Sequence, residues 1–142
     1  MLVSDFIDPT STFEVMNIDS ENKVFFVDGN PAFIEFKQEI FPTLFNVKVL
    51  SQLPYLIVDM GAVSHVCNGA DILAPGITKI SGNINIGSFV VILEEKFSKK
   101  IAIAKALLSS SEMVSKKQGK VAENIHYVSD KFWNMIKEEN II

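Results

Sequence analysis

Runs of apolar residues with strand-like alternation, broken by turn residues, predict a small antiparallel sheet in the first third of the chain. The expected strands are Phe13–Asn17, Val24–Val27 and Ala32–Phe36. Asp19–Asn22 supplies a polar turn between the first two, and either Asp28-Gly29 or Gly29-Asn30 reverses the chain into the third. Pro31 suits the start of that strand, because a missing N–H is tolerated there. The pattern therefore predicts a meander.

Apolar positions at helical spacing follow this meander. Pro42 is compatible with the first turn of a helix, and three apolar residues after it share one helix face, so the expected helix is Thr43–Leu50. Leu53-Pro54 then disfavours helical backbone and marks a boundary. We expect an N-terminal domain over residues 1–52, a second domain over 53–135 and a charged tail over 136–142.

The segment from Tyr55 to Ile77 combines a strand, a capped helix and two glycine-containing turns. Tyr55–Val58 is an apolar run, and Asp59 is placed to cap the helix expected over Met60–Cys67. Asn68-Gly69 supplies a left-handed helix stop. In the Pro75-Gly76 turn, glycine is free to take positive φ. The helix face expected to be apolar comprises Met60, Val63 and Cys67.

The remaining apolar runs predict further strands at 72–73, 89–93, 100–107 and 125–128. In the third of these, alanine at alternate positions predicts one small, closely packed face. Ser109-Ser110-Ser111-Glu112 is a candidate cap for a short segment that ends at Gly119, and a charged helical tail is expected from Asp130. Strands dominate. The expected fold class is therefore α+β, mainly β: a small N-terminal α/β domain, then a compact β-barrel-like domain over roughly 53–129.

Charge is distributed unevenly along the chain. The formal net charge is −4; residues 1–60 carry three lysines and nine acids, whereas residues 61–142 carry ten lysines and eight acids. Seven lysines and one acid lie between residues 96 and 120. The net charge argues against an indiscriminate nucleic-acid binder. The excess of lysines over acids in residues 61–142 assigns any anion-binding face to the C-terminal part. The chain contains no arginine, so shape and backbone would dominate recognition of an RNA.

The sequence offers no set of groups for catalysis. It contains no phosphate-binding loop, no dinucleotide glycine signature and no paired catalytic acids. Cys67, the single cysteine, is expected to be a small buried apolar group, since His65 would point to a different side of the helix. His126 is expected to pack and hydrogen-bond at a strand. We therefore expect no cofactor, no metal site and no enzymatic activity.

The N-terminus carries Asp5 and Asp8 and lacks the basic start and apolar run of a signal peptide. No stretch reaches the roughly 18 apolar residues that span a bilayer. We therefore expect a cytoplasmic protein that has no membrane partner.

Four motifs in a fixed order resemble a PUA domain, the small RNA-binding pseudobarrel named after pseudouridine synthases and archaeosine transglycosylases. They are VDMGAV, NGADILAPGI, GSFVVIL and IAIAKALL. Upstream DGNP and FPTL, with downstream ENIHY and Phe132-Trp133, are similar to the malignant T-cell amplified sequence family and its archaeal relatives. The resemblance covers about residues 28–135. It implies a small N-terminal domain, a C-terminal PUA domain and a role in translation on the small ribosomal subunit.

The resemblance also implies an RNA-facing surface built from the helix after the first PUA strand, the loop that follows it and a later strand edge. The matching positions are Gly69, Ala70, Asp71, Pro75 and Gly76, with Lys79 nearby. Glycine lets an RNA backbone approach closely. Relatives often place basic residues where this chain has the neutral Met60, Ser64 and Asn68. Three further lysines could partly compensate: Lys99, Lys100 and Lys105.

Each of these signals has a simpler structural explanation. Gly69 and Gly76 can serve only as a helix stop and a turn residue, and the lysines can form an ordinary solvated face. The first hypothesis is a noncatalytic protein of the translation apparatus that binds structured RNA, either tRNA or small-subunit rRNA, and the small ribosomal subunit. The alternative is an adaptor in a ribosome-associated or RNA-modification complex, whose acidic N-terminal domain docks a protein partner.

Overall fold

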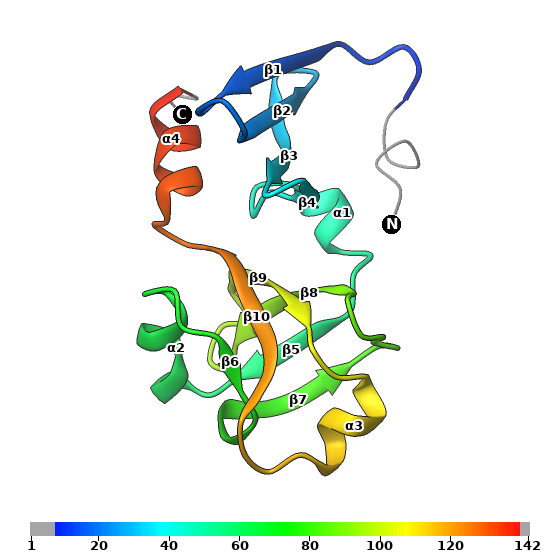
Figure 1. The fold of residues 1–142 in the computed structure, drawn as a ribbon, viewed down its shortest axis with the longest axis vertical. Helices are drawn as coiled ribbons and strands as arrows, with labels where there is room; N and C mark the ends of the chain where they lie inside the picture. The colour runs from blue at the N-terminus through cyan, green and yellow to red at the C-terminus, as the bar shows by residue number, and fades with distance from the viewer. Residues whose placement is uncertain (1–7, 140–142) are drawn as a thin grey trace. The chain divides into compact units, whose positions relative to one another are not determined.

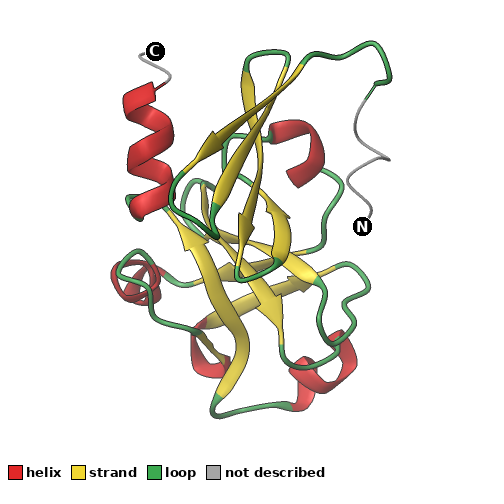
Figure 2. Cartoon of the chain, turned by 45° about the horizontal axis from the view of Figure 1, so that its top comes forward, coloured by secondary structure: helices red, strands yellow, loops and turns green. Residues whose placement is uncertain are grey.

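The computed structural model describes residues 8–139, and the chain divides into two compact units, Met1–Ser51 and Gln52–Ile142 (Figure 1). Strands make up most of the regular structure of each unit, as Figure 2 shows in yellow. Asp5, on which the expected lack of a signal peptide partly depends, lies outside the described residues, as do residues 140–142 of the expected tail. No helix within 8–139 has the length and apolar character needed to cross a membrane.

Between residues 8 and 51, the N-terminal unit is an antiparallel sheet of four strands in the order β1-β2-β3-β4, with one short helix. The predicted three-strand meander is confirmed, and the sheet contains one strand more than expected. Ala32, Phe33 and Val49 form a small buried cluster in this unit, against which Phe25, Val27 and Ile40 pack. The elements are β1 (Phe13–Asn17), β2 (Lys23–Val27), β3 (Asn30–Phe36), β4 (Glu39–Pro42) and α1 (Val47–Leu50).

The prediction of a helix from Thr43 is wrong, because the chain stays bonded to β3 at this point. Pro42 belongs to β4 and lies opposite Phe33. The backbone N–H of Thr43 donates to the carbonyl of Ala32 at 3.0 Å, and its hydroxyl donates to the carbonyl of Pro31 at 3.0 Å. Helix α1 begins only after Asn46, whose side-chain oxygen accepts from Val49 N at 3.3 Å. Tertiary hydrogen bonds therefore override the helical spacing of the apolar residues.

The C-terminal unit is a curled sheet of six strands in the order β6-β10-β9-β8-β5-β7. Only the β5–β8 pair is parallel among these pairings, and the other neighbours are antiparallel. Its strands are β5 (Tyr55–Val58), β6 (Ile72–Leu73), β7 (Ile77–Ser81), β8 (Phe89–Glu94), β9 (Lys100–Ala106) and β10 (Lys120–Tyr127). Its helices are α2 (Met60–Val66), the 3₁₀ helix η2 (Ala74–Gly76), α3 (Ser110–Ser115) and α4 (Lys131–Glu139).

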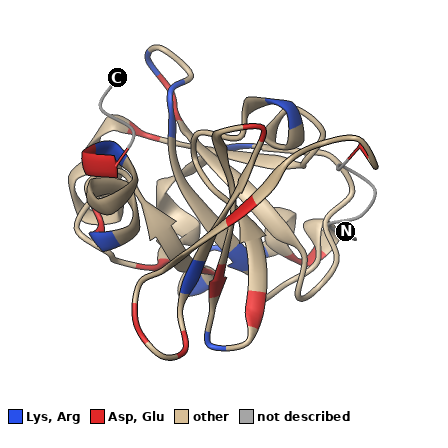
Figure 3. Cartoon of the chain, turned by 90° about the horizontal axis from the view of Figure 1, so that it is seen from above, with Lys and Arg blue, Asp and Glu red and all other residues tan. Residues whose placement is uncertain are grey.

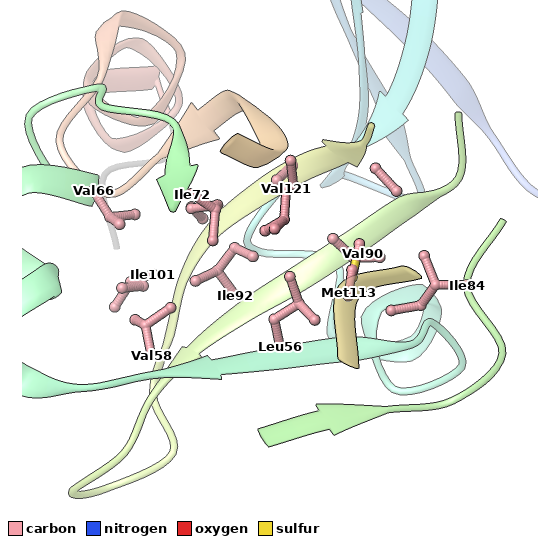
Figure 4. Packing of buried hydrophobic residues seen from close by; sticks show 14 residues of the cluster. Leu56, Val58, Val66, Ile72, Ile84, Val90, Ile92, Ile101, Met113 and Val121 are labelled. Atoms are coloured by element: carbon pink, nitrogen blue, oxygen red, sulfur yellow. The ribbon is translucent and has the colours of Figure 1, made fainter. Parts of the chain in front are cut away.

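A hydrophobic core fills the inside of this curled sheet. Leu56, Val58, Val90 and Ile92 from the central strands meet Met113 from α3 in this core (Figure 4). The alternating alanines of β9 are fully buried, as expected for a small face. The isoleucines on the other face of β9 are at most 5% exposed as well. Strand β9 is therefore buried on both faces, and both of its edges are paired because it lies between β10 and β8 in the sheet.

Local capping signals are confirmed where they were predicted. The Asp59 carboxylate accepts from Ala62 N at 2.9 Å at the start of α2. The Ser109 hydroxyl accepts from Glu112 N at 3.3 Å while the Glu112 carboxylate accepts from Ser109 N at 3.1 Å, which is the reciprocal capping box. Strand extents were predicted less well. The last strand begins at Lys120 instead of residue 125, and β7 was not predicted.

The helical segment expected from Asp130 is α4, and it packs through its apolar side. Phe132 is 3% and Ile136 is 1% exposed. His126 lies on β10 and is fully buried, and its Nδ1 is 2.8 Å from Oδ2 of Asp130. The expectation that His126 packs and hydrogen-bonds at a strand is confirmed.

Candidate nucleic-acid interface

The segment that carries the sequence motifs folds around a pocket of about 300 Å³. Helix α2 forms one wall, and β6 with η2 forms the other. Every lining residue comes from one stretch of chain between Val58 and Gly76, and most of the lining is apolar. The lining residues are Val58, Ala62, His65, Val66, Ala70, Asp71, Ile72, Leu73, Pro75 and Gly76. The pocket is therefore a local product of this segment, with the curled sheet as its support.

Gly76 allows the two walls to approach each other. A Cβ at this position would lie 3.2 Å from the Cβ of Ala62, which is tighter than most real contacts. The Gly76 carbonyl also accepts from Asp59 N at 2.9 Å, so η2 is joined to the start of α2. The prediction that Gly76 uses positive φ in a turn is wrong, because its φ is not positive and the residue ends a 3₁₀ helix. Glycine therefore favours the close packing of the two walls at this position.

Gly69 ends the helix in the left-handed conformation, as predicted, with φ of +94°. It does not line the pocket. The position where its Cβ would stand lies 3.2 Å from Oη and 3.3 Å from Cε1 of Tyr127 on β10. The loop after α2 thus packs directly on an aromatic ring of the last strand, and both the backbone conformation and this contact favour glycine.

Asn124 and Asp71 join the same loop to β10. The side-chain amide of Asn124 donates to the carbonyls of Val66 and Ala70, each at 3.0 Å. The Asp71 carboxylate accepts from Asn124 N at 3.0 Å and forms an ion pair with Lys120 at 3.0 Å. The carboxylate of Asp71 therefore serves as an anchor for a pocket wall, in addition to lining the pocket. The ENIHY motif is explained by these contacts, since Asn124 and Tyr127 both hold the loop.

The structure brings together four of the nine predicted RNA-contact residues, namely Ala70, Asp71, Pro75 and Gly76. Gly69 lies next to Ala70. The lysines lie on other elements and do not line the pocket: Lys79 on β7, Lys99 before β9, and Lys100 and Lys105 on β9. Figure 3 shows lysines as blue segments and acids as red segments at separate places on the ribbon.

The apolar part of the site was not predicted from the sequence. Of the three residues predicted to share one helix face, Val63 and Cys67 pack against the core, whereas Met60 is 43% exposed. Ala62, His65 and Val66 line the pocket, and they recur at the i, i+3, i+4 spacing of a helix face. That spacing was the available signal.

The titratable groups around the site are used for structure. Burial raises the pKa of the Cys67 thiol, which disfavours the nucleophilic thiolate, and Cys67 packs against the core as expected. Within residues 8–139, no group of three or more His, Cys, Asp or Glu side chains could hold a metal ion. What the site presents is an apolar pocket and the backbone groups of the segment that lines it.

Fold and pocket together define a small, mainly β binding domain with a curled sheet and a helix–loop pocket at one end of its strands. The PUA domain model matches residues 54–128, which is more than half of the chain. The chain therefore belongs to the PUA domain family, and the curled sheet is the pseudobarrel of that RNA-binding fold.

Relatives along nearly the whole chain are also found. An uncharacterized protein of Methanocaldococcus jannaschii is 35% identical over 118 residues, covering 82% of this chain and 73% of the relative. Translation machinery-associated protein 20 of Saccharomyces cerevisiae is 28% identical over 144 residues, covering 96% and 80%. Malignant T-cell-amplified sequence 1 of Rattus norvegicus is 27% identical over 113 residues, covering 75% and 62%. The resemblance inferred from the motifs is confirmed.

Solved structures show the same fold similarity. A hypothetical protein of the hyperthermophilic archaeon Pyrococcus horikoshii has a TM-score of 0.81 and 32% identity, covering 94% of this chain and 84% of that chain. A chain in the structure of an H/ACA RNP bound to a substrate RNA has a TM-score of 0.56 and 31% identity, covering 69% of this chain and 30% of that one.

Proposed function

We propose that this protein is a noncatalytic RNA-binding protein of the cytoplasmic translation apparatus, which contacts structured RNA, such as tRNA or small-subunit rRNA, at the Val58–Gly76 pocket. The observation that carries the proposal is the pocket itself. It is apolar, it is formed by the motif segment of an RNA-binding family, and its loop is anchored to β10 through Asn124 and Tyr127. The names of the yeast relatives support the link to translation.

Recognition at this pocket would depend on shape and stacking more than on base-edge hydrogen bonds. The pocket walls supply apolar surface for a base or ribose, and the chain lacks the planar guanidinium groups that read base edges. Lys79 on β7 is exposed, and its ammonium lies 5.9 Å from the centre of the Tyr55 ring. Lysines of this kind would bind phosphates as point charges around the pocket.

Salt dependence tests the electrostatic part of the proposal. Affinity for tRNA and for small ribosomal subunits should fall as salt rises, and K79Q should lower the log–log slope by about 0.7 to 0.9 if Lys79 neutralises one phosphate. K48Q is the matched control, because Lys48 is an exposed lysine on α1 in the acidic N-terminal unit. Binding isotherms at several salt concentrations measure the slope. No binding at about 50 mM salt would refute the proposal.

Filling the pocket tests its apolar part. Ala70 is exposed and lines the pocket, so A70L can occupy the pocket without entering the core. We expect A70L to weaken RNA binding by about 5- to 100-fold, the range that loss of one stacked base produces. S111L is the control, since Ser111 is an exposed residue of α3 and does not line the pocket. Equal affinities of A70L and the wild type would show that RNA does not enter the pocket.

The adaptor alternative has a specific observation in its favour. Strand β1 is at the edge of the N-terminal sheet, and Phe13 and Val15 on it are 50% and 47% exposed. Exposed apolar residues on an edge strand favour pairing with another chain. Absence of RNA binding, together with a defined protein partner that requires residues 1–52, would support the adaptor.

A further inference from the structure

The connection between β8 and β9 presents an aromatic ring among lysines. Phe97 is 65% exposed, although phenylalanine is one of the residues that gain most from burial. The ammonium groups of Lys96 and Lys99 lie 5.2 and 5.7 Å from the centre of its ring, within the range of cation–π attraction. Lys100 follows directly at the start of β9. We call residues 96–100 the lysine–phenylalanine tip.

A buried carboxylate holds the tip in this conformation. Glu94 is 5% exposed, and its Oε1 accepts from the backbone N–H groups of Phe97 and of Lys99, the latter at 3.3 Å. Ser98 has φ of +55°, and its N–H donates to the Glu94 carbonyl at 3.1 Å. Burying a carboxylate and placing serine at positive φ both cost free energy. The tip is therefore a preorganised turn that keeps the Phe97 ring in solvent.

The base of the tip is joined to the pocket segment. Glu95 N donates to the carbonyl of Val58 at 3.1 Å, and the Glu95 carboxylate accepts from Met60 N at 3.1 Å. Val58 itself lines the pocket. In Figure 4 the loop between β8 and β9 extends past the end of β5 that carries Val58. The tip and the pocket thus lie at the same end of strand β5.

We propose that the lysine–phenylalanine tip is a second RNA-contact point, at which an unpaired base stacks on Phe97 while Lys96, Lys99 and Lys100 bind the flanking phosphates. This inference rests on the proposed function and extends it to a site that does not line the pocket. Two ammonium groups near one aromatic ring, with a third lysine next in the chain, are complementary to a nucleotide, which combines a flat ring with a negative charge. A lipid surface would call for a larger apolar area than one ring provides.

The test uses the full chain with an RNA hairpin that carries a single-stranded extension and with the same hairpin lacking the extension. F97A should lower affinity for the extended hairpin by about 5- to 100-fold and leave affinity for the blunt hairpin unchanged. Its salt slope should equal that of the wild type, because no charge is removed. K99Q and K100Q should instead each lower the slope by about 0.7, the value for single strands.

Two further variants separate stacking from simple hydrophobicity. F97W should retain affinity and gain fluorescence quenching on binding, whereas F97L should lose affinity as F97A does. V114A is the control, because Val114 is a 76% exposed apolar residue on α3. If F97A binds the extended hairpin as the wild type does, the inference is wrong while the proposed function stands. If the wild type binds neither hairpin, tRNA nor ribosomal subunits, both are wrong. Loss of binding to anionic vesicles in F97A, with RNA affinity unchanged, would also overturn the inference.

Discussion

Replacing Asp130 by alanine is expected to lower the free energy of unfolding of the C-terminal unit by about 3–5 kcal/mol, because a buried partner is left unpaired. The Asp130 carboxylate is 2.8 Å from Nδ1 of the fully buried His126 and accepts from Tyr127 N at 3.0 Å. Its other oxygen accepts from Trp133 N at 2.8 Å in the first turn of α4. One side chain therefore supports the last strand and the C-terminal helix together.

The loss of stability can be followed by tryptophan fluorescence, because the single tryptophan of the chain, Trp133, lies in α4. Urea denaturation followed by tryptophan fluorescence measures the stability of the C-terminal unit. N134A is a suitable control: Asn134 donates to the carbonyl of Ser129 at 3.1 Å in an exposed setting, so its loss should cost less than about 1 kcal/mol. A loss below about 1 kcal/mol for D130A would mean that water replaces the carboxylate at His126.

Replacing Asn124 by alanine is expected to cost about 2 kcal/mol of stability and to weaken RNA binding by about tenfold, because the loop that forms the pocket wall would have to order on binding. The amide of Asn124 donates to the carbonyls of Val66 and Ala70, and its own backbone N–H donates to Asp71. The N124A variant keeps only the hydrogen bond from the backbone N–H of residue 124 to the Asp71 carboxylate. Urea denaturation and RNA titration measure the two effects on the same protein preparation.

The matched control for this variant is N83A, because Asn83 is an exposed asparagine in the loop after β7 and does not line the pocket. N83A should change the free energy of unfolding by no more than about 0.5 kcal/mol and should leave RNA affinity unchanged. If N124A lost stability but bound RNA as the wild type does, the pocket wall would not need its anchor, and the role assigned to the ENIHY motif in binding would be wrong.

Predictions succeeded where a few neighbouring residues decide the conformation. The Asp59 cap, the Ser109–Glu112 capping box and the left-handed Gly69 each depend on contacts within four residues, so the pattern of the chain contains the whole signal. The strand-rich C-terminal domain was predicted for the same reason, since alternation along each strand is local. The four motifs indicated the family, and the family indicated where the site was expected.

Predictions failed where contacts with a segment far away in the sequence determine the local conformation. The helix expected from Thr43 loses to hydrogen bonds with the backbone of Pro31 and Ala32, which are more than ten residues away. Gly76 was assigned to a turn with positive φ, but the structure shows that the closeness of Ala62 across the pocket is what favours glycine. Neither competing contact has a signature in the local pattern, because each depends on how strands and helices meet.

By itself, the sequence determined the class of fold, the family and the segment that forms the site, because caps, turns and strand alternation are short-range and the motifs lie in a fixed order. Only the tertiary structure decided what that segment does in space. It closes around an apolar pocket, it is anchored by Asn124 and Tyr127 from a strand more than fifty residues away, and it has the lysine–phenylalanine tip beside it. These features follow from strand order and register, which pair residues that no local pattern brings together.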